Sequence, residues 1–180
     1  MSEFRKEIEK YAKYVIKQSR TNLTKKKHNN TKELFNSLSY KVRQNRGNSG
    51  RFESGYEVSF DLGDYGDYQD QGVHGTNSSY IENKGSKFKY KSSSNLIGLE
   101  AATGTFAEFA KRKRLKFRNL KNGKFITYVQ MGFVLAQSIK KKGIKASKFF
   151  SKPFEKADEK FGDKIAVAYG NDIIKKLIEK

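Results

Sequence analysis

An α+β fold is predicted for this chain of 180 residues, and three observations predict it. Apolar side chains recur every three or four residues at the start of the chain, which is the period of an amphipathic helix. They alternate with polar side chains between residues 38 and 62, which is the period of a half-buried strand. Helical spacing returns after residue 98. We therefore expect an N-terminal helix, a small antiparallel sheet of three strands or more, and two or three helices packed on that sheet, in a single domain covering residues 1–180.

The N-terminal helix is predicted over residues 3–18, with charged residues on the face opposite its apolar stripe. That stripe consists of Phe4, Ile8, Tyr11 and Val15. Residues 22–30 are polar and basic, so a loop is expected there. Thr31 follows this loop and is a residue type that caps short helical turns.

Residues 38–62 are predicted to form strands that each have one solvent-exposed face. The half-buried positions are Leu38, Tyr40 and Val42 in the first strand and Tyr56, Val58, Phe60 and Leu62 in the second. Gly63 and Asp64 are the residue types of a two-residue hairpin turn. We therefore expect a third strand over residues 65–71 and a three-stranded antiparallel meander.

The second half of the chain predicts a loop and then helices. Residues 74–95 are rich in Gly, Ser, Asn and Lys without periodicity, so a long mobile loop is expected. A helix is predicted near residues 99–109. Thr127 is expected to cap a further helix that Gly143 ends. Apolar and aromatic residues at intervals of four predict a terminal amphipathic helix, and its stripe consists of Ile165, Tyr169, Ile173 and Leu177.

The composition excludes several kinds of chemistry. The chain has no cysteine, which excludes disulfides, thiol nucleophiles and cysteine metal sites. His28 and His74 are the only histidines, too few for a multi-histidine metal site, and we expect neither a metal nor a cofactor. No apolar run approaches eighteen residues, and the first ten residues lack an apolar signal core. We therefore expect a protein that stays in a cytoplasm-like compartment until it joins an assembly.

The formal net charge of +19 should attract polyanions or an acidic protein. Lysine makes up 30 of the 38 basic residues, which does not favour a dedicated reader of DNA bases. The candidate contact residues form two runs, Lys111, Arg112, Lys113, Arg114, Lys116 and Arg118 in the first and Lys140, Lys141 and Lys142 in the second. Two other interpretations stay open, because cations also suit the C-terminal end of a helix dipole and lysine-rich surfaces are often merely solvated.

Residues 51–75 have the opposite charge, with six acidic residues and one basic residue. Four aspartates in this segment are spaced by three: Asp61, Asp64, Asp67 and Asp70. A two-metal nuclease needs carboxylates that converge on sites about 4 Å apart, whereas a spacing of three on a strand alternates between its faces. We interpret these aspartates as turn and solvent-facing residues that form an acidic patch for docking on a neighbouring copy.

The segment around His74 does not indicate an active site. No second histidine or cysteine accompanies His74 to complete a triad or a metal site. Gly72 and Gly75 lack the G-K-[ST] ending of a phosphate-binding loop. We expect a loop histidine, with the two glycines providing backbone freedom where a strand leaves the sheet.

Two segments together resemble one family of virion proteins. They read YQDQGVHGT over residues 68–76 and LAQSIKKKGIKASKFFSKPF over residues 135–154. In this order, with a helix and a small sheet before the first segment and a helix after the second, they are similar to the tail-completion or neck proteins of the head–tail connector of tailed phages. The resemblance implies structural roles for the matching positions Gly72, Gly75, Gly143, Phe149, Phe150 and Pro153.

This resemblance implies a subunit without enzymatic residues that assembles into a ring between the portal vertex and the tail. The expected partners are further copies of the chain, the portal, adaptor and tail proteins, and double-stranded DNA touched without specificity in the lumen. The expected location is the virion, and the host cytoplasm during assembly. Two alternatives stay open, a non-specific nucleic-acid-binding protein on the strength of the charge and, less favoured, a metal-dependent nuclease built on the aspartates.

Overall fold

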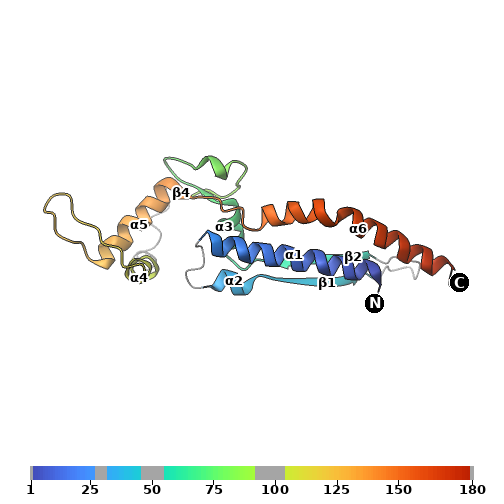
Figure 1. Cartoon of the computed structure of the whole chain (residues 1–180). Helices are drawn as coiled ribbons and strands as arrows, with labels where there is room; N and C mark the ends of the chain where they lie inside the picture. The colour runs from blue at the N-terminus through green and yellow to red at the C-terminus, as the bar shows by residue number, and fades with distance from the viewer. Residues whose placement is uncertain (1, 27–31, 46–54, 92–103, 179–180) are drawn as a thin grey trace. The chain divides into compact units, whose positions relative to one another are not determined.

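The computed structural model describes residues 2–26, 32–45, 55–91 and 104–178, and it confirms the predicted α+β class (Figure 1). In chain order the elements are α1 (Glu3–Lys25), α2 (Glu33–Ser37), β1 (Ser39–Asn45), β2 (Gly55–Asp61), α3 (Gly66–Gln71), β3 (Val73–His74), the 3-10 helix η1 (Ile81–Asn83), α4 (Phe106–Arg112), α5 (Tyr128–Lys142), β4 (Gly143–Ile144) and α6 (Ser151–Ile178). Strand β1 pairs with β2 and strand β3 with β4, both antiparallel. The described residues therefore contain two small sheets of two strands each.

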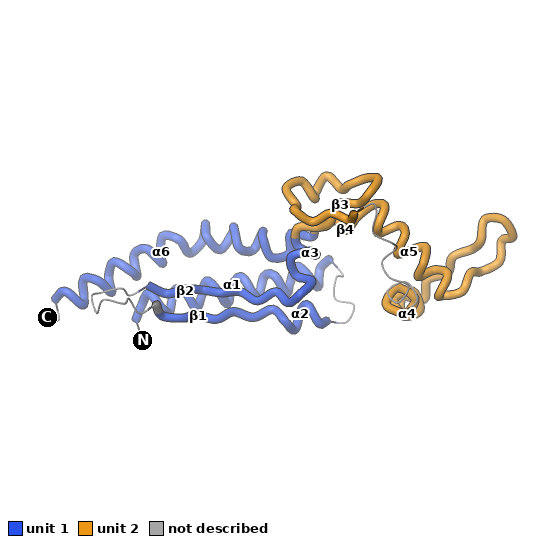
Figure 2. Tube along the Cα trace, turned by 180° about the vertical axis from the view of Figure 1, so that it is seen from behind, with its two compact units in different colours: residues 1–70, 147–180 blue, residues 71–146 orange. Residues whose placement is uncertain are grey.

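The chain forms two compact units (Figure 2). Unit 1 contains residues 1–70 and 147–180, and unit 2 contains residues 71–146. Unit 2 is thus an insertion in the sequence of unit 1. Compact units are not necessarily independent domains, so the single domain over residues 1–180 stays a prediction.

Helix α1 is longer than the predicted helix over residues 3–18, because its buried stripe continues past that point. The buried side chains are Ile8, Tyr11, Ala12, Val15, Ile16, Ser19 and Leu23. Leu23 is fully buried although its neighbours in the sequence are polar. Residues 22–25 therefore belong to the helix rather than to the expected loop, while His28 and Thr31 lie outside the described residues.

Helix α6 packs along α1 and completes the first cluster of buried residues (Figure 1). The ring centre of Phe161 lies 6.3 Å from that of Tyr11 and 5.5 Å from that of Tyr14. The Tyr11 hydroxyl bonds to Asp158 at 2.8 Å, and burial, together with this bond, raises the pKa of Tyr11.

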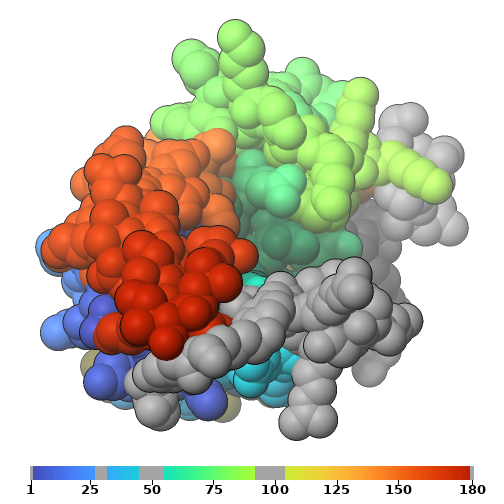
Figure 3. Space-filling model, turned by 90° about the vertical axis from the view of Figure 1, so that its right-hand side faces the viewer, coloured from blue at the N-terminus to red at the C-terminus, as the bar shows by residue number. Residues whose placement is uncertain are grey.

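The residues that α6 buries differ from the predicted stripe. The helix begins at Ser151, with Pro153 in its first turn, where the missing N–H of proline is tolerated. Its buried residues are Pro153, Ala157, Phe161 and Ala168. Leu177, from the predicted stripe, is 65% exposed. In Figure 3 the last turns of α6, in dark red, face the viewer at the surface.

Strands β1 and β2 form the predicted hairpin ladder. Tyr40 lies opposite Phe60 and Val42 opposite Val58. These four side chains are half-buried, and the residues between them are exposed, which confirms the alternation. The Phe60 ring centre lies 5.4 Å from that of Phe150, so the hairpin joins the same core as α1 and α6.

The predicted third strand over residues 65–71 is wrong, because this segment forms helix α3. The Asp61 carboxylate accepts a hydrogen bond from the Gly63 N–H at 2.9 Å, and Gly63 has a left-handed φ of 66°, which turns the chain out of the strand. The buried residues of α3 are Gly66 and Asp70. These residues are four apart, the spacing of one helix face.

Unit 2 contains more regular structure than the expected loop over residues 74–95. The N–H of His74 donates to the Phe88 carbonyl at 2.9 Å, and the N–H of Tyr90 donates to the His74 carbonyl at 3.0 Å. The described part of this segment is therefore held by backbone hydrogen bonds, while residues 92–95 lie outside the described residues. The mobility of the segment stays a prediction.

The predicted start and end of α5 are confirmed. The Thr127 hydroxyl accepts from the Gln130 N–H at 3.3 Å, and the Gln130 side chain accepts from the Thr127 N–H at 2.9 Å, which is a capping box. Gly143 ends the helix with a φ of 85°. Helix α4, which packs against α5, begins at Phe106, and the earlier part of the helix predicted near residues 99–109 lies outside the described residues.

Candidate functional site

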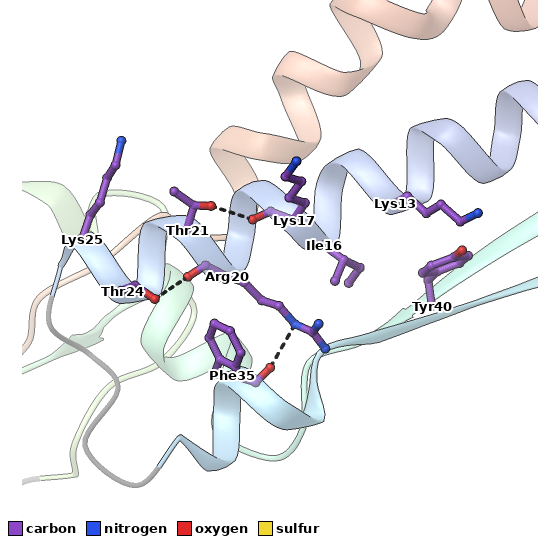
Figure 4. Close-up of a pocket in the computed structure, with 9 residues that line it drawn as sticks. All are labelled: Lys13, Ile16, Lys17, Arg20, Thr21, Thr24, Lys25, Phe35 and Tyr40. Carbon is purple, nitrogen blue, oxygen red and sulfur yellow. Dashed lines mark hydrogen bonds between the residues drawn. The ribbon is translucent and has the colours of Figure 1, made fainter.

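A groove of about 840 Å³ runs along unit 1 between α1, α2 and β1 (Figure 4). Its lining residues are Lys13, Ile16, Lys17, Arg20, Thr21, Thr24, Lys25, Phe35 and Tyr40. Ile16, Phe35 and Tyr40 supply the apolar part, and no carboxylate is among the lining residues.

Arg20 joins the two sides of this groove. Its Nε donates to the Phe35 carbonyl at 3.2 Å, a bond drawn in Figure 4, and its terminal nitrogen donates to the Leu38 carbonyl at 2.9 Å. The guanidinium also lies 5.2 Å from the centre of the Phe35 ring, within the range of a cation–π contact. Arg20 therefore holds α2 against α1 and fixes the shape of the groove.

Three exposed lysines give the groove a positive rim: Lys13, Lys17 and Lys25. The ammonium of Lys13 lies 4.0 Å from a Glu9 carboxylate oxygen, which is a weak exposed pair. Lys17 and Lys25 form no ion pair with a described residue. An apolar floor with cations around it suits an aromatic side chain that is flanked by carboxylates.

A second surface of unit 1 has the complementary character. We call residues 61–68 the acidic turn; it links β2 to α3. Asp61, Asp64 and Asp67 are exposed, and Tyr65 between them is 75% exposed. Residues 61–70 contain no lysine or arginine. The acidic turn therefore presents an aromatic ring among three carboxylates.

Asp70 does not belong to an exposed acidic patch, contrary to the sequence prediction. It is only 4% exposed. Its carboxylate accepts hydrogen bonds from the N–H groups of Phe150 at 2.7 Å and Ser151 at 3.2 Å, and from the Ser151 hydroxyl. These donors lie at the start of α6, so Asp70 caps that helix.

The chain leaves unit 1 and returns to it at one hydrogen-bonded junction. The Gln69 carbonyl accepts from the Ser147 N–H at 3.0 Å and from the Ser147 hydroxyl at 2.7 Å. The Asp70 carbonyl accepts from the Lys148 N–H at 3.0 Å. Next to this junction, Phe149 is fully buried in a cluster with Ile16, Leu23 and Leu38. The segment that carries Phe149, Phe150 and Pro153 thus anchors the returning chain in the core.

Within unit 2, Asn83 is a structural residue that the sequence analysis missed. Its side chain is fully buried and makes three hydrogen bonds to backbone. The amide nitrogen donates to the carbonyls of Val73 and Ile144, both at 2.9 Å, and the oxygen accepts from the Ala146 N–H at 2.8 Å. Asn83 therefore ties β3 to β4 and to the residues that follow β4.

Gly75 and Gly143 meet where β3 and β4 pair. A Cβ on Gly75 would collide with the Lys141 carbonyl, and a Cβ on Gly143 would collide with the Val73 carbonyl. A Cβ on Gly72 would likewise collide with the Asn83 side-chain oxygen and the Ala146 nitrogen. The strand pair therefore requires glycine at these positions for close backbone approach.

The two predicted basic runs do not form one site. Lys111, Arg112, Lys113, Arg114, Lys116 and Arg118 are all exposed and lie in the segment from the end of α4 into the following hairpin. Lys140, Lys141 and Lys142 lie in the last turn of α5. Since a helix rises about 1.5 Å per residue, the second run is about 20 Å from the start of α5, where the hairpin joins it.

The described residues contain no candidate metal site. No group of three His, Asp or Glu in this part of the chain is placed to hold a metal ion. The Nδ1 atom of His74 is hydrogen-bonded to the Ser79 hydroxyl. In the described ranges, no helix is both long enough and apolar enough to span a lipid bilayer.

Comparison with known proteins returns no match to a family model, to a curated protein or to a solved structure.

Proposed function

We propose that this chain is a structural subunit of the head–tail connector of a tailed phage, which assembles into a ring between the portal-side proteins and the tail. The observation that carries the ring assembly is the pair of complementary surfaces on unit 1, and the placement in a phage connector rests on the resemblance of residues 68–76 and 135–154 to neck proteins. The groove offers an apolar floor with exposed lysines, and the acidic turn offers Tyr65 among three exposed aspartates.

Two different surfaces that fit each other on one protein produce head-to-tail contacts. Such contacts close into a ring when the rotation between neighbours permits it. Opposite charges around the contact set its register and disfavour wrong pairings. Insertion of Tyr65 into the groove of the next copy would bury the exposed ring and pair Asp64 with Lys17.

Additional exposed apolar surface on α6 supports an assembly role. The exposed side chains near its end include Val167, Ile174, Leu177 and Ile178, all more than half exposed. Exposed apolar groups gathered on one helix are typical of surfaces that become covered by a partner. A subunit that is covered by its neighbours in an assembly is expected to carry this kind of surface.

Cross-linking tests the contact in a chain that has no cysteine of its own. The Asp64→Cys, Lys17→Cys double variant, treated with a short bismaleimide, should give a ladder of covalent multimers that ends at one closed size. The Asp64→Cys, Lys156→Cys variant is the matched control, because Lys156 is exposed on α6 away from the groove. A ladder no stronger than that of the control would contradict the contact.

Imaging of purified phage particles tests the location. We expect density for this chain in a ring between the head and the tail. Absence of the chain from purified particles would refute the connector assignment even if purified protein forms rings.

A further inference from the structure

We propose that the hairpin of unit 2 between α4 and α5, together with the end of α4, binds the backbone of double-stranded DNA without sequence specificity. The carrying observation is a set of eight exposed cations on residues 111–124: Lys111, Arg112, Lys113, Arg114, Lys116, Arg118, Lys121 and Lys124. This site is independent of the ring contact, which uses residues of unit 1.

The hairpin has a defined backbone, which fixes the positions from which its basic side chains extend. The N–H of Ile126 donates to the Phe117 carbonyl at 3.0 Å, and the N–H of Asn119 donates to the Lys124 carbonyl at 2.8 Å. Arg118 and Phe125 form an antiparallel bridge between the two arms. Figure 1 shows this hairpin as the loop that extends from the chain between α4 and α5.

The charged residues of this segment are nearly all basic. Between residues 104 and 146 the sequence has twelve basic residues and one acidic residue, Glu108. None of the eight cations at positions 111–124 forms an ion pair with a described residue. Among the described residues these positive charges have no carboxylate partners, and a polyanion would relieve their mutual repulsion.

The density of cations favours a nucleic acid over an acidic protein. Duplex DNA carries one negative charge per about 1.7 Å of its axis, so many phosphates can approach a short basic segment at once. An acidic protein would need a comparably dense run of carboxylates on one small surface.

The aromatic residues favour a duplex over a single strand. Proteins that bind single strands offer free aromatic faces on which bases stack. Here Phe125 is 58% exposed, but the Arg118 guanidinium lies 4.7 Å from the centre of its ring and covers one of its faces. A two-stranded ribbon of this kind also fits the major groove of B-DNA, which is about 12 Å wide. Leu120, at the exposed tip, is fully exposed and has no hydrogen-bonding group with which to read a base edge.

Fluorescence anisotropy with labelled 30-base-pair duplexes of two unrelated sequences tests the site in the full-length chain. We expect similar affinities for both duplexes and a steep loss of binding with salt. The four-fold variant Lys116→Gln, Arg118→Gln, Lys121→Gln, Lys124→Gln should bind at least about tenfold more weakly near 0.15 M salt, and its salt slope should fall by about 3 to 4.

A control variant carries the same change of net charge on unit 1: Lys41→Gln, Lys152→Gln, Lys156→Gln, Lys164→Gln. These lysines are exposed, and we expect less than about a threefold change in affinity from their loss. Circular dichroism should show the same helix content for both variants, because all eight side chains are on the surface.

Three results would overturn the proposal. The hairpin variant and the control variant could weaken binding equally, which would mean that only net charge matters. A single strand of the same length could bind more tightly than the duplex, which would indicate a single-strand site. Polyglutamate could bind while the duplex does not, which would assign the surface to an acidic protein.

Discussion

At the scale of single residues, Asn83 explains how unit 2 is held together with few buried apolar side chains. It is fully buried, and its amide connects β3, β4 and the Ala146 nitrogen. An asparagine amide supplies both donors and acceptors, so one side chain satisfies three backbone groups that would otherwise lack partners. Backbone groups left unpaired inside a protein are costly.

Substitution of Asn83 by Ala should therefore destabilise unit 2 selectively. The change leaves two carbonyls and one N–H without their partner, and each buried polar group without a hydrogen bond costs about 1–3 kcal/mol. We expect amide hydrogen exchange to accelerate in β3 and β4 and to stay unchanged in α1. Asn77→Ala is the matched control, because Asn77 is exposed in the same segment. Equal effects of the two substitutions would contradict the structural role of Asn83.

At the scale of secondary structure elements, two helices of unit 1 are capped by aspartates from distant parts of the chain. Asp70 caps the start of α6. Asp172, near the end of α6, accepts from the N–H groups of Glu3 at 3.2 Å and Phe4 at 3.1 Å, at the start of α1. Each cap places a negative charge at the positive end of a helix dipole. The caps thus join elements that the sequence separates widely.

The cap by Asp172 should make stability depend on pH in the acidic range. Partial burial acts to raise the pKa of Asp172, but hydrogen bonds from the Phe4 N–H, the Ser2 side chain and the Glu3 N–H outweigh it, so the pKa lies below its ordinary value. A lowered pKa in the folded state means that the stabilisation is complete above the unfolded pKa, about 3.9 for Asp, and disappears as the pH falls through the folded value.

Asp172→Asn keeps the shape of the side chain but removes the charge and one of the two acceptors, because an amide nitrogen cannot accept a hydrogen bond. At neutral pH we expect the free energy of unfolding to fall by about 0.5–1 kcal/mol, the usual size of a helix-end charge effect. The difference from the unsubstituted chain should begin to shrink below about pH 4 and disappear as the pH falls through the lowered pKa of Asp172 in the folded state. Urea denaturation at several pH values measures it. A difference that stays constant from pH 7 to pH 2 would contradict the charged cap.

Periodicity predicted the elements that bury a continuous stripe or an alternating face, as the start of α1, the β1–β2 ladder and the capped start of α5 show. It failed where distant partners decide the conformation. Asp70 is buried because its carboxylate accepts a hydrogen bond from Ser151, which is 81 positions away. Asp70 lies in helix α3 and not in the predicted strand. Asn83 carries no local pattern at all, because its three partners lie on β3, on β4 and after β4.

The candidate surfaces were predictable only in part, for the same reason. The exposed basic run at positions 111–118 and three of the four aspartates were visible as charge patterns in the sequence. The groove was not, because it forms between residues of α1, α2 and β1 that the sequence separates. Its floor residues, Ile16, Phe35 and Tyr40, look like ordinary core residues when the sequence is read alone.

At the scale of the whole molecule, the charge is divided unequally between the two units. Residues 71–146 contain sixteen basic and three acidic residues, a net charge of +13. The rest of the chain has 22 basic and 16 acidic residues, a net charge of +6. The two proposals agree with this difference, because DNA contact is proposed for the more basic unit 2 and assembly for unit 1.

Unit 1 should fold without the insertion, because the two clusters of buried apolar residues found in the described ranges lie in it. The ends to be rejoined are adjacent, since the Ser147 N–H donates to the Gln69 carbonyl at 3.0 Å, so a linker of about five Gly and Ser residues can replace residues 71–146. We expect cooperative thermal unfolding, helical circular dichroism and loss of duplex binding. Adding Asp70→Ala to this shortened chain should lower its stability by about 1–3 kcal/mol, because the cap of α6 belongs to unit 1. A shortened chain without dispersed amide resonances would show instead that unit 1 depends on unit 2.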